Sequence, residues 1–400
     1  MRPNAVLLAL AAYLFCRAAL GATLNPLNNG PDESAHVEYV ATVAEGRAAT
    51  GAEARQLPAY YVLASIPWRL LDGPVERSFG VRVLSAAAGV VTLVATWRAA
   101  RVAWPVEPGR PPLAALFLLA PGHLFLLATV NNDPLVSALS TLSFLAALRV
   151  WARPTAPRRW ALWVVVSLAA LAVRPTALPV ALGAGAAFAW RWRGRLLRTT
   201  PTRSVVAGLL LAAFAVNVFF ALQPPTLSAL ASLARFWPLA AVRAPVAYVA
   251  RGGIVETFRT WWYGYDYLVR WPASVEAVLA ATCLVVTGGA VLGLAVAGRR
   301  GAPPIVWACA GAQVAFVLGR YGFADVLRID MGGAAQAKAF FTGIAPLALL
   351  GAAGLSSIAR RLRLSERAVA VTFFAWLLAL DAVSLAVTSW HHYRWWQVGA

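Results

Sequence analysis

The sequence is poor in charged residues, in lysine and in cysteine. Charged residues fill 13% of its 400 positions, Lys338 is the only lysine, and there are three cysteines. A soluble domain carries about 25% charged residues, so this chain lacks the polar residues that would cover a water-soluble globule. Cys16, Cys283 and Cys309 all lie in apolar segments at spacings unlike those of metal sites, which predicts buried small hydrophobic side chains.

Long apolar segments are abundant, because 60% of the residues are hydrophobic. Runs of about 18 to 25 apolar residues can cross ~30 Å of hydrocarbon as helices. We therefore predict an all-α, polytopic membrane protein in which residues 1–400 form a single transmembrane domain of about 11 transmembrane helices. The predicted spans are 4–24, which we expect to stay uncleaved, 79–97, 112–130, 134–150, 160–173, 176–190, 204–222, 273–298, 303–320, 339–358 and 368–389. The short 160–173 segment and its neighbour could alternatively form a re-entrant pair.

The excess positive charge of +19 is distributed as a topology signal rather than as a nucleic-acid-binding surface. Of the 35 basic residues, 18 lie in five short loops between spans, whereas 13 of the 16 acidic residues lie on the opposite side. Because cytoplasmic loops retain arginine, we predict a cytoplasmic N-terminus and an external face that holds the carboxylates. The five arginine-rich loops are 98–111, 149–159, 191–203, 299–304 and 360–367.

The external loops 25–78, 223–272 and 321–338 are too short for a separate globular domain. An active site would therefore lie where these loops meet the outer ends of the helices. The turn-rich stretch 25–36 leads into a predicted helix over 33–48, with Asp32 and Glu33 at its N-terminus. An ionised carboxylate there can act as a general base, and capping of a surface helix is the alternative.

Several segments of the external face match known motifs in the same order along the chain. The first, residues 31–36, reads Pro-Asp-Glu-Ser-Ala-His. The others are 56–61, 79–85, 131–133 and 174–178, followed more weakly by 258–264 and 336–341. Together they resemble the motifs of GT-C glycosyltransferases, a superfamily that includes protein O-mannosyltransferases and aminoarabinose transferases. The similarity is greatest to a bacterial branch that carries Pro-Asp-Glu-x-x-His in its first loop.

The resemblance implies a membrane glycosyltransferase of a bacterial inner membrane, with its active site on the outer face. It implies a polyprenyl-phosphate sugar as donor, an inverting displacement at the anomeric carbon, and a glycan, lipid or protein acceptor that supplies a hydroxyl or an amine. By residue match the general base is Asp32, with Glu33 as the second candidate. Nucleic acid is not an expected partner.

The chain departs from the family pattern at Gln56, where the family has His or Lys, and at Leu57, where it has Pro. A cationic contact to the donor phosphate is therefore missing, and Arg82, Arg174 or Lys338 are the candidates to supply it. The alternative is that Arg82 and Arg174 anchor helix ends at lipid headgroups and that Lys338 is loop charge.

The remaining candidate substrate-binding residues carry alternatives of their own. His36 lies four residues after Asp32, so both could face one site, although a surface histidine is as simple. Tyr60 and Tyr61 belong to the 56–61 motif. Asp133 suits a turn, or it is a second acid that positions the acceptor or joins Asp32 around a divalent cation such as Mg or Mn. No metal cluster is legible from the spacing alone.

Two further features, a pair of tryptophans and an acid within a span, can each be interpreted as structural or as functional. Trp261 and Trp262 lie in an aromatic-rich loop that forms either a belt at the headgroup level or a stacking surface for a sugar or prenyl chain. Asp381 is the one acid inside a predicted span, where a carboxylate has a partner or a function unless it lies harmlessly near the outer end. Alternative functions are a transporter or flippase of lipid-linked sugars and a non-catalytic cell-envelope assembly protein.

Overall fold

A computed structural model describes most of the chain as helices. The described residues are 3–30, 32–48, 53, 56–192, 246, 248–250, 252–263, 272–298, 301–326 and 337–398, with the backbone alone for 3, 320–326 and 391–398. Within these ranges the elements are α-helices and short 3-10 helices, without a strand. The prediction of an all-α polytopic protein is confirmed.

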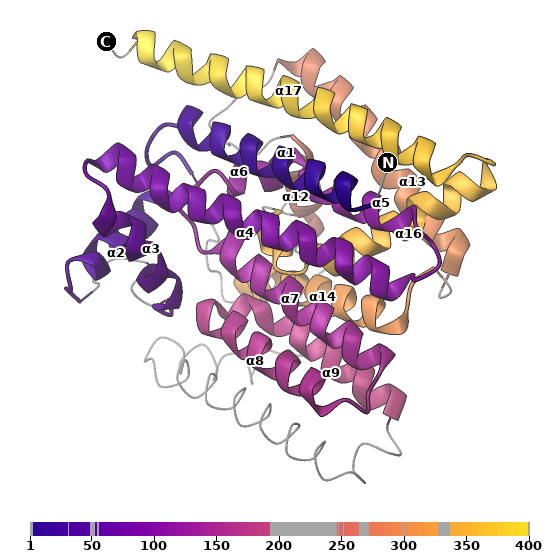
Figure 1. Ribbon diagram of the computed structural model, residues 1–400. Coiled ribbons are helices and arrows are strands. Elements are labelled where there is room, and N and C mark those ends of the chain that lie inside the picture. The colour runs from indigo at the N-terminus through magenta and orange to yellow at the C-terminus, as the bar shows by residue number, and fades with distance from the viewer. Residues whose placement is uncertain are drawn as a thin grey trace.

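The helices run back and forth through one bundle (Figure 1). α1 packs on α4, α4 on α7, and α7 on α8, while α13 packs on α16 and α9 on α14. Their bounds are α1 Pro3–Leu24, α2 Glu33–Ala44, α3 Ala59–Leu70, α4 Pro74–Ala103, α5 Arg110–Leu116, η2 Phe117–Leu119, α6 Pro121–Leu126, α7 Asp133–Ala152, α8 Pro157–Val173, η3 Pro175–Ala177, α9 Leu178–Trp192, α12 Gly253–Trp262, α13 Ala273–Ala297, α14 Pro304–Val326, α15 Lys338–Phe341, α16 Ile344–Arg361 and α17 Glu366–Val398.

Five of the described helices are long and apolar enough to cross a membrane, namely α1, α4, α7, α13 and α17. Two of the predicted spans are interrupted. The 112–130 segment breaks at Pro121, because the residue before a proline is pushed out of the helical region, and Ala120 has an extended ψ of 132°. The 339–358 segment breaks at Gly343, between α15 and α16. The 204–222 span lies outside the described residues, so the count of eleven stays a prediction.

The two ends of the bundle differ in chemistry. The turns that follow α4, α7 and α16 share one end of the bundle (Figure 1). These turns and the helix ends beside them carry arginines, which predicts that this end faces the cytoplasm. The opposite end carries α2 and α3, which pack on each other and, through α3, on the start of α4. Their shared core includes Tyr39, Tyr60, Tyr61 and Trp68. The observed α2 ends at Ala44, four residues before the predicted helix end.

A buried polar contact joins the first and last helices inside the bundle. Asp381 of α17 accepts hydrogen bonds from Arg17 Nε at 2.7 Å and Nη2 at 2.9 Å, and from the Tyr13 hydroxyl at 3.0 Å. Asp381 therefore has a partner within the bundle, as expected for an acid at membrane depth. Cys283 and Cys309 are buried as predicted, but Cys16 is exposed on α1, so that prediction was wrong for one cysteine.

Candidate active site

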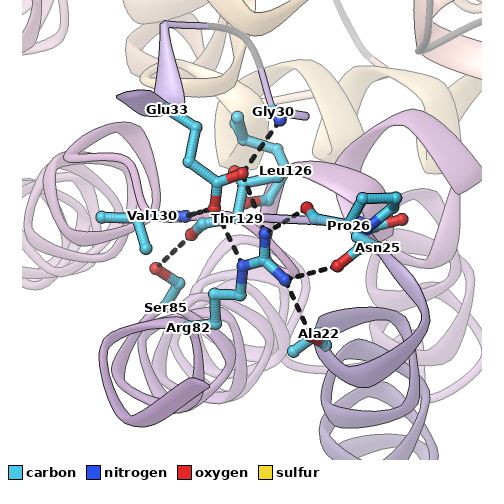
Figure 2. A network of polar contacts seen from close by, with 10 residues as sticks. All are labelled: Ala22, Asn25, Pro26, Gly30, Glu33, Arg82, Ser85, Leu126, Thr129 and Val130. Atoms are coloured by element: carbon cyan, nitrogen blue, oxygen red, sulfur yellow. Dashed lines mark hydrogen bonds and ion pairs between the residues drawn. The ribbon is translucent and has the colours of Figure 1, made fainter. Parts of the chain in front are cut away.

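Arg82 and Glu33 form a buried clamp at the end of the bundle that carries α2 (Figure 2). Arg82 Nε and Nη2 donate to the two carboxylate oxygens of Glu33 at 2.8 and 2.9 Å. The remaining N–H groups of Arg82 donate to the backbone carbonyls of Ala22, Asn25 and Pro26, each at 2.8 Å. Both side chains belong to residues that are only 1% exposed. All five donors of the guanidinium are therefore occupied within the protein.

The carboxylate oxygens of Glu33 are likewise fully hydrogen-bonded. Besides Arg82, its Oε1 accepts from the Val130 backbone N–H at 2.7 Å, and its Oε2 accepts from the Gly30 N–H at 2.9 Å. The backbone of Gly30 lies so close to Thr129 that a side chain at position 30 would clash, because a Cβ there would lie 2.7 Å from Cγ2 of Thr129. These contacts place Glu33 and Arg82 in a structural role. Neither side chain has a free hydrogen-bonding position to offer a substrate.

Asp32 directly precedes this clamp and has a different environment. Its backbone is left-handed, with φ 59° and ψ 13°, and its side chain caps no backbone N–H of α2. Aspartate is among the few residues that tolerate this conformation. Its Oδ2 instead accepts a hydrogen bond from Lys338 Nζ at 2.8 Å, and the Asp32 side chain remains 59% exposed. The capping alternative is thus not what the structure shows.

The Asp32 carboxylate is held in its ionised form. Burial raises its pKa, but the nearby ammonium of Lys338, followed by His36 and Arg174, lowers it further than burial raises it, so the net pKa is below the ordinary value. Asp32 is therefore a charged acceptor at neutral pH, beside two cations of the chain.

Lys338 reaches Asp32 from the start of α15, far along the chain. The segment is anchored by the Ala337 N–H, which donates to Thr260 Oγ1 of α12 at 2.8 Å. Trp261, next to Thr260, packs its ring 5.2 Å from the ring of Phe341 of α15. The helices α12 and α15, whose sequences resemble the GT-C motifs only weakly, thus lie near the first loop of the chain.

Trp262 takes a different position from its neighbour. Its indole N–H donates to Thr287 Oγ1 at 3.0 Å, and its ring packs against Phe117 and Trp376 in the bundle core. Its predicted role as a stacking residue is not supported by this burial, because a ring buried among helices presents no face to a ligand. Trp261, half-buried beside α15, remains the one candidate of the two.

A second ion pair lies at the start of α7. Asp133 is buried and pairs with Nη1 of Arg174, which also donates to Asn132 Oδ1 at 2.9 Å. The Asp133 backbone N–H donates to Asn131 Oδ1 at 2.8 Å, which fixes the turn before α7. Asp133 therefore serves the turn and also pairs with Arg174, whose charge contributes to the lowered pKa of Asp32.

The 56–61 motif joins the same cluster through polar contacts. Gln56 Oε1 accepts from the Asn132 side-chain amide and from the Tyr61 hydroxyl at 3.4 Å. His36 Nδ1 lies 2.9 Å from the same hydroxyl. Burial lowers the pKa of His36 to about 4, so its ring is neutral at pH 7. Tyr60 is fully buried in the α2–α3 core and packs rather than facing the site.

One acidic residue of this cluster was missed in the sequence. Glu53 lies close enough to Arg174, Asp32, Lys338 and Asp133 for each to affect its titration. It belongs to no motif, and its neighbours in the sequence give no periodic or spacing signal. Only the three-dimensional position of Glu53 shows that it belongs to the site.

A divalent cation does not fit the residues described. No group of three or more His, Cys, Asp or Glu side chains in the described ranges could hold a metal ion. Asp32 and Asp133, the predicted ligands, are each neutralised by a cation of the chain itself, Lys338 and Arg174. Mg²⁺ prefers carboxylate oxygens that are open to it.

The described helices and this charged cluster define a polytopic, all-helical membrane protein with a polar site at one end of its bundle. No protein-family model and no curated protein matches the sequence. The structure is similar to ArnT from Cupriavidus metallidurans bound to undecaprenyl phosphate, at 13% identity and a TM-score of 0.42, over 88% of this chain and 77% of ArnT. It is also similar to the archaeal oligosaccharyltransferase AglB from Archaeoglobus fulgidus, in complex with an inhibitory peptide and a dolichol-phosphate, at 15% identity and a TM-score of 0.45. The match covers 95% of this chain and 55% of AglB, so the chain spans about half its length.

Proposed function

We propose that this chain is a GT-C-type membrane glycosyltransferase that moves a sugar from a polyprenyl-phosphate donor to an acceptor hydroxyl or amine, with inversion. One observation carries the proposal. Asp32 and Lys338, 306 positions apart and each within a segment that resembles a GT-C motif, meet at 2.8 Å. A carboxylate beside a cation supplies both a base and a phosphate-binding group, which are the two groups that transfer from a lipid phosphate requires.

In the proposed reaction Asp32 takes the proton of the acceptor nucleophile. The acceptor oxygen or nitrogen forms a bond to the anomeric carbon of the donor sugar. The bond from that carbon to the phosphate oxygen breaks, and its electron pair leaves with the polyprenyl phosphate. Lys338 and Arg174 stabilise the negative charge that develops on the leaving phosphate.

Lys338 links donor binding to the strength of the base. Its ammonium carries three donors, so it can hold a donor phosphate while it loosens its contact with Asp32. The pKa of Asp32 then rises from its lowered value toward the ordinary one, which makes the carboxylate a stronger base. Among the described contacts Arg174 uses only Nη1, and the rest of its planar guanidinium suits a phosphate.

We further propose a bacterial inner-membrane location with the site on the outer face. The support is the arginine content of the loops at the opposite end of the bundle, since cytoplasmic loops retain arginine. Glu38→Cys, at an exposed position of α2, is expected to react with a membrane-impermeant maleimide added outside intact inner-membrane spheroplasts. Reaction only after the membrane is opened would contradict this orientation.

The direct test begins with the lipids that copurify with the wild-type protein, identified by mass spectrometry to choose the donor. Transfer from that donor is then measured in proteoliposomes for the wild type, Asp32→Asn and the matched control Glu38→Gln. We expect Asp32→Asn to lose on the order of 10²- to 10⁴-fold in turnover, as when a general base is removed, and Glu38→Gln to keep its rate.

Two outcomes would oppose the proposal. Normal turnover of Asp32→Asn would remove Asp32 as the base. Movement of the lipid across the liposome membrane without any transfer of its sugar would favour a flippase. The non-catalytic alternative is tested with Asp32→Asn alone, because loss of Glu33 would also break the buried clamp.

A further inference from the structure

The Glu53 carboxyl is the one acid of the site without a cation of its own among the described contacts. The residue lies between α2 and α3 and is partly buried. Its Oε2 is shielded from solvent and has no hydrogen-bond partner in the described part of the chain. Buried polar atoms are nearly always paired, so an unpaired carboxyl oxygen beside a proposed site requires an explanation.

The charges around Glu53 make an ionised carboxylate unfavourable there. The cluster contains three acids, Asp32, Glu53 and Asp133, and two cations, Lys338 and Arg174. Both cations are already engaged in ion pairs with the other two acids. With His36 neutral and Glu53 ionised, the cluster would carry a net charge of −1 (two cations against three acids).

Protonation of Glu53 removes this imbalance. Burial raises the pKa of Glu53; the Arg174 cation opposes that effect, Asp32 adds to it, and the net direction is upward. Protonation also gives the carboxyl group an O–H that can donate a hydrogen bond, whereas an ionised carboxylate can only accept hydrogen bonds. A donor phosphate brings a further negative charge and needs hydrogen-bond donors rather than another carboxylate.

We propose that Glu53 binds the phosphate of the lipid donor as a neutral carboxylic acid, donating its proton in a hydrogen bond alongside Lys338 and Arg174. This rests on the proposed lipid-phosphate donor and adds a third phosphate contact that the family motifs do not contain. It also compensates in part for Gln56, which stands where the family carries a cation.

The consequence is that the donor phosphate binds most tightly while Glu53 keeps its proton. As the pH rises past the pKa of Glu53 in the free protein, affinity falls by up to about tenfold per pH unit. The charged and titratable groups that interact electrostatically with Glu53 are Arg174, Asp32, Lys338, Asp133 and Tyr61. Of these, Asp32 has a lowered pKa and Tyr61 a raised one, which moves both away from the range between pH 5.5 and 8.

The test measures binding instead of catalysis. Methyl undecaprenyl phosphate is a phosphodiester that keeps one negative charge across this pH range and cannot transfer a sugar. Its dissociation constant is determined between pH 5.5 and 8 with the full-length protein in nanodiscs, for the wild type, Glu53→Gln, Glu53→Ala and the control Glu38→Gln. Size-exclusion profiles verify that each variant is folded.

We expect the affinity of the wild type and of Glu38→Gln to fall as the pH rises. Glu53→Gln keeps a permanent donor and is expected to bind at the low-pH wild-type affinity throughout. Glu53→Ala, without the donor, is expected to bind about tenfold more weakly at pH 5.5 and to show no pH dependence.

The outcomes separate this proposal from the function on which it rests. Saturable binding to the wild type with an unchanged pH dependence in Glu53→Gln would overturn the role of Glu53 and leave the lipid-phosphate donor intact. No saturable binding to the wild type at any pH would overturn the donor class, and the role of Glu53 with it.

Discussion

Asp32 and Glu33 are consecutive carboxylates at the start of one helix, yet their surroundings are opposite. Glu33 is buried and accepts four hydrogen bonds, two of them from Arg82. Asp32 is largely exposed and accepts one described bond, from Lys338. The left-handed backbone at Asp32 separates the directions of the two residues. Of the pair, only Asp32 has oxygen lone pairs free for a reacting proton.

The comparison also explains how the exposed Asp32, the proposed base, is held in place. The clamp ties the first residue of α2 to α4 and to the chain that follows α1 and α6 (Figure 2). Asp32 directly precedes Glu33, so its backbone position is fixed by a neighbour whose carboxylate is engaged within the protein. A reactive residue whose backbone is held by a buried neighbour is preorganised, as a functional site requires.

The largest expected effect comes from breaking the clamp. Arg82→Met leaves the buried Glu33 charge and three backbone carbonyls without their partner, and we expect a loss of about 3 to 5 kcal/mol in the free energy of unfolding. Thermal unfolding in detergent, followed by intrinsic fluorescence, measures the loss. Arg77→Met, on a less buried arginine of the same helix, is the control. Equal stability of the two variants would contradict the structural role of Arg82.

A smaller effect is expected at Lys338. Lys338→Ala removes a phosphate contact, so kcat/KM for the donor should fall on the order of 10- to 100-fold. Burial raises the pKa of Asp32 and Lys338 is the main group that lowers it; without Lys338 that pKa rises. Because the base acts only when ionised, the acidic limb of the pH–rate profile should move to higher pH. An unshifted limb would show that Lys338 does not act on the base, and Lys338→Arg should restore part of the rate.

The smallest effect is the loss of stability in Asp32→Asn. An exposed ion pair contributes about 0 to 1 kcal/mol, so this variant should unfold within ~1 kcal/mol of the wild type. Chemical denaturation in mixed micelles measures the difference. A loss as large as that of Arg82→Met would give Asp32 a structural role and weaken the contrast between the two carboxylates.

The sequence predicted the elements well where periodicity and length decide them. The spans that became α1, α7 and α13 match their predicted limits closely. The break at Pro121 was also visible in principle, since a proline within an apolar run interrupts the helix, but the run of hydrophobic residues around it masked the signal. Glycine at 343 gives a weaker signal still.

The partners of the site residues were beyond prediction. His36, Gln56, Tyr61, Asp133 and Arg174 come from four different motifs, and the structure joins them in one polar network. No sequence pattern shows which of two adjacent carboxylates will point toward an arginine 49 positions away. Such pairings depend on how several helix ends converge, which is a property of the packed bundle rather than of any local segment.

The central claim is that catalysis depends on Asp32 and structural support on Glu33. It is tested most directly by measuring turnover per folded molecule and unfolding free energy together for Asp32→Asn and Glu33→Gln. The account predicts that Asp32→Asn keeps wild-type stability and loses turnover, and that Glu33→Gln loses stability while its folded fraction still transfers sugar. The reverse result, an active Asp32→Asn and an inactive but stable Glu33→Gln, would contradict it.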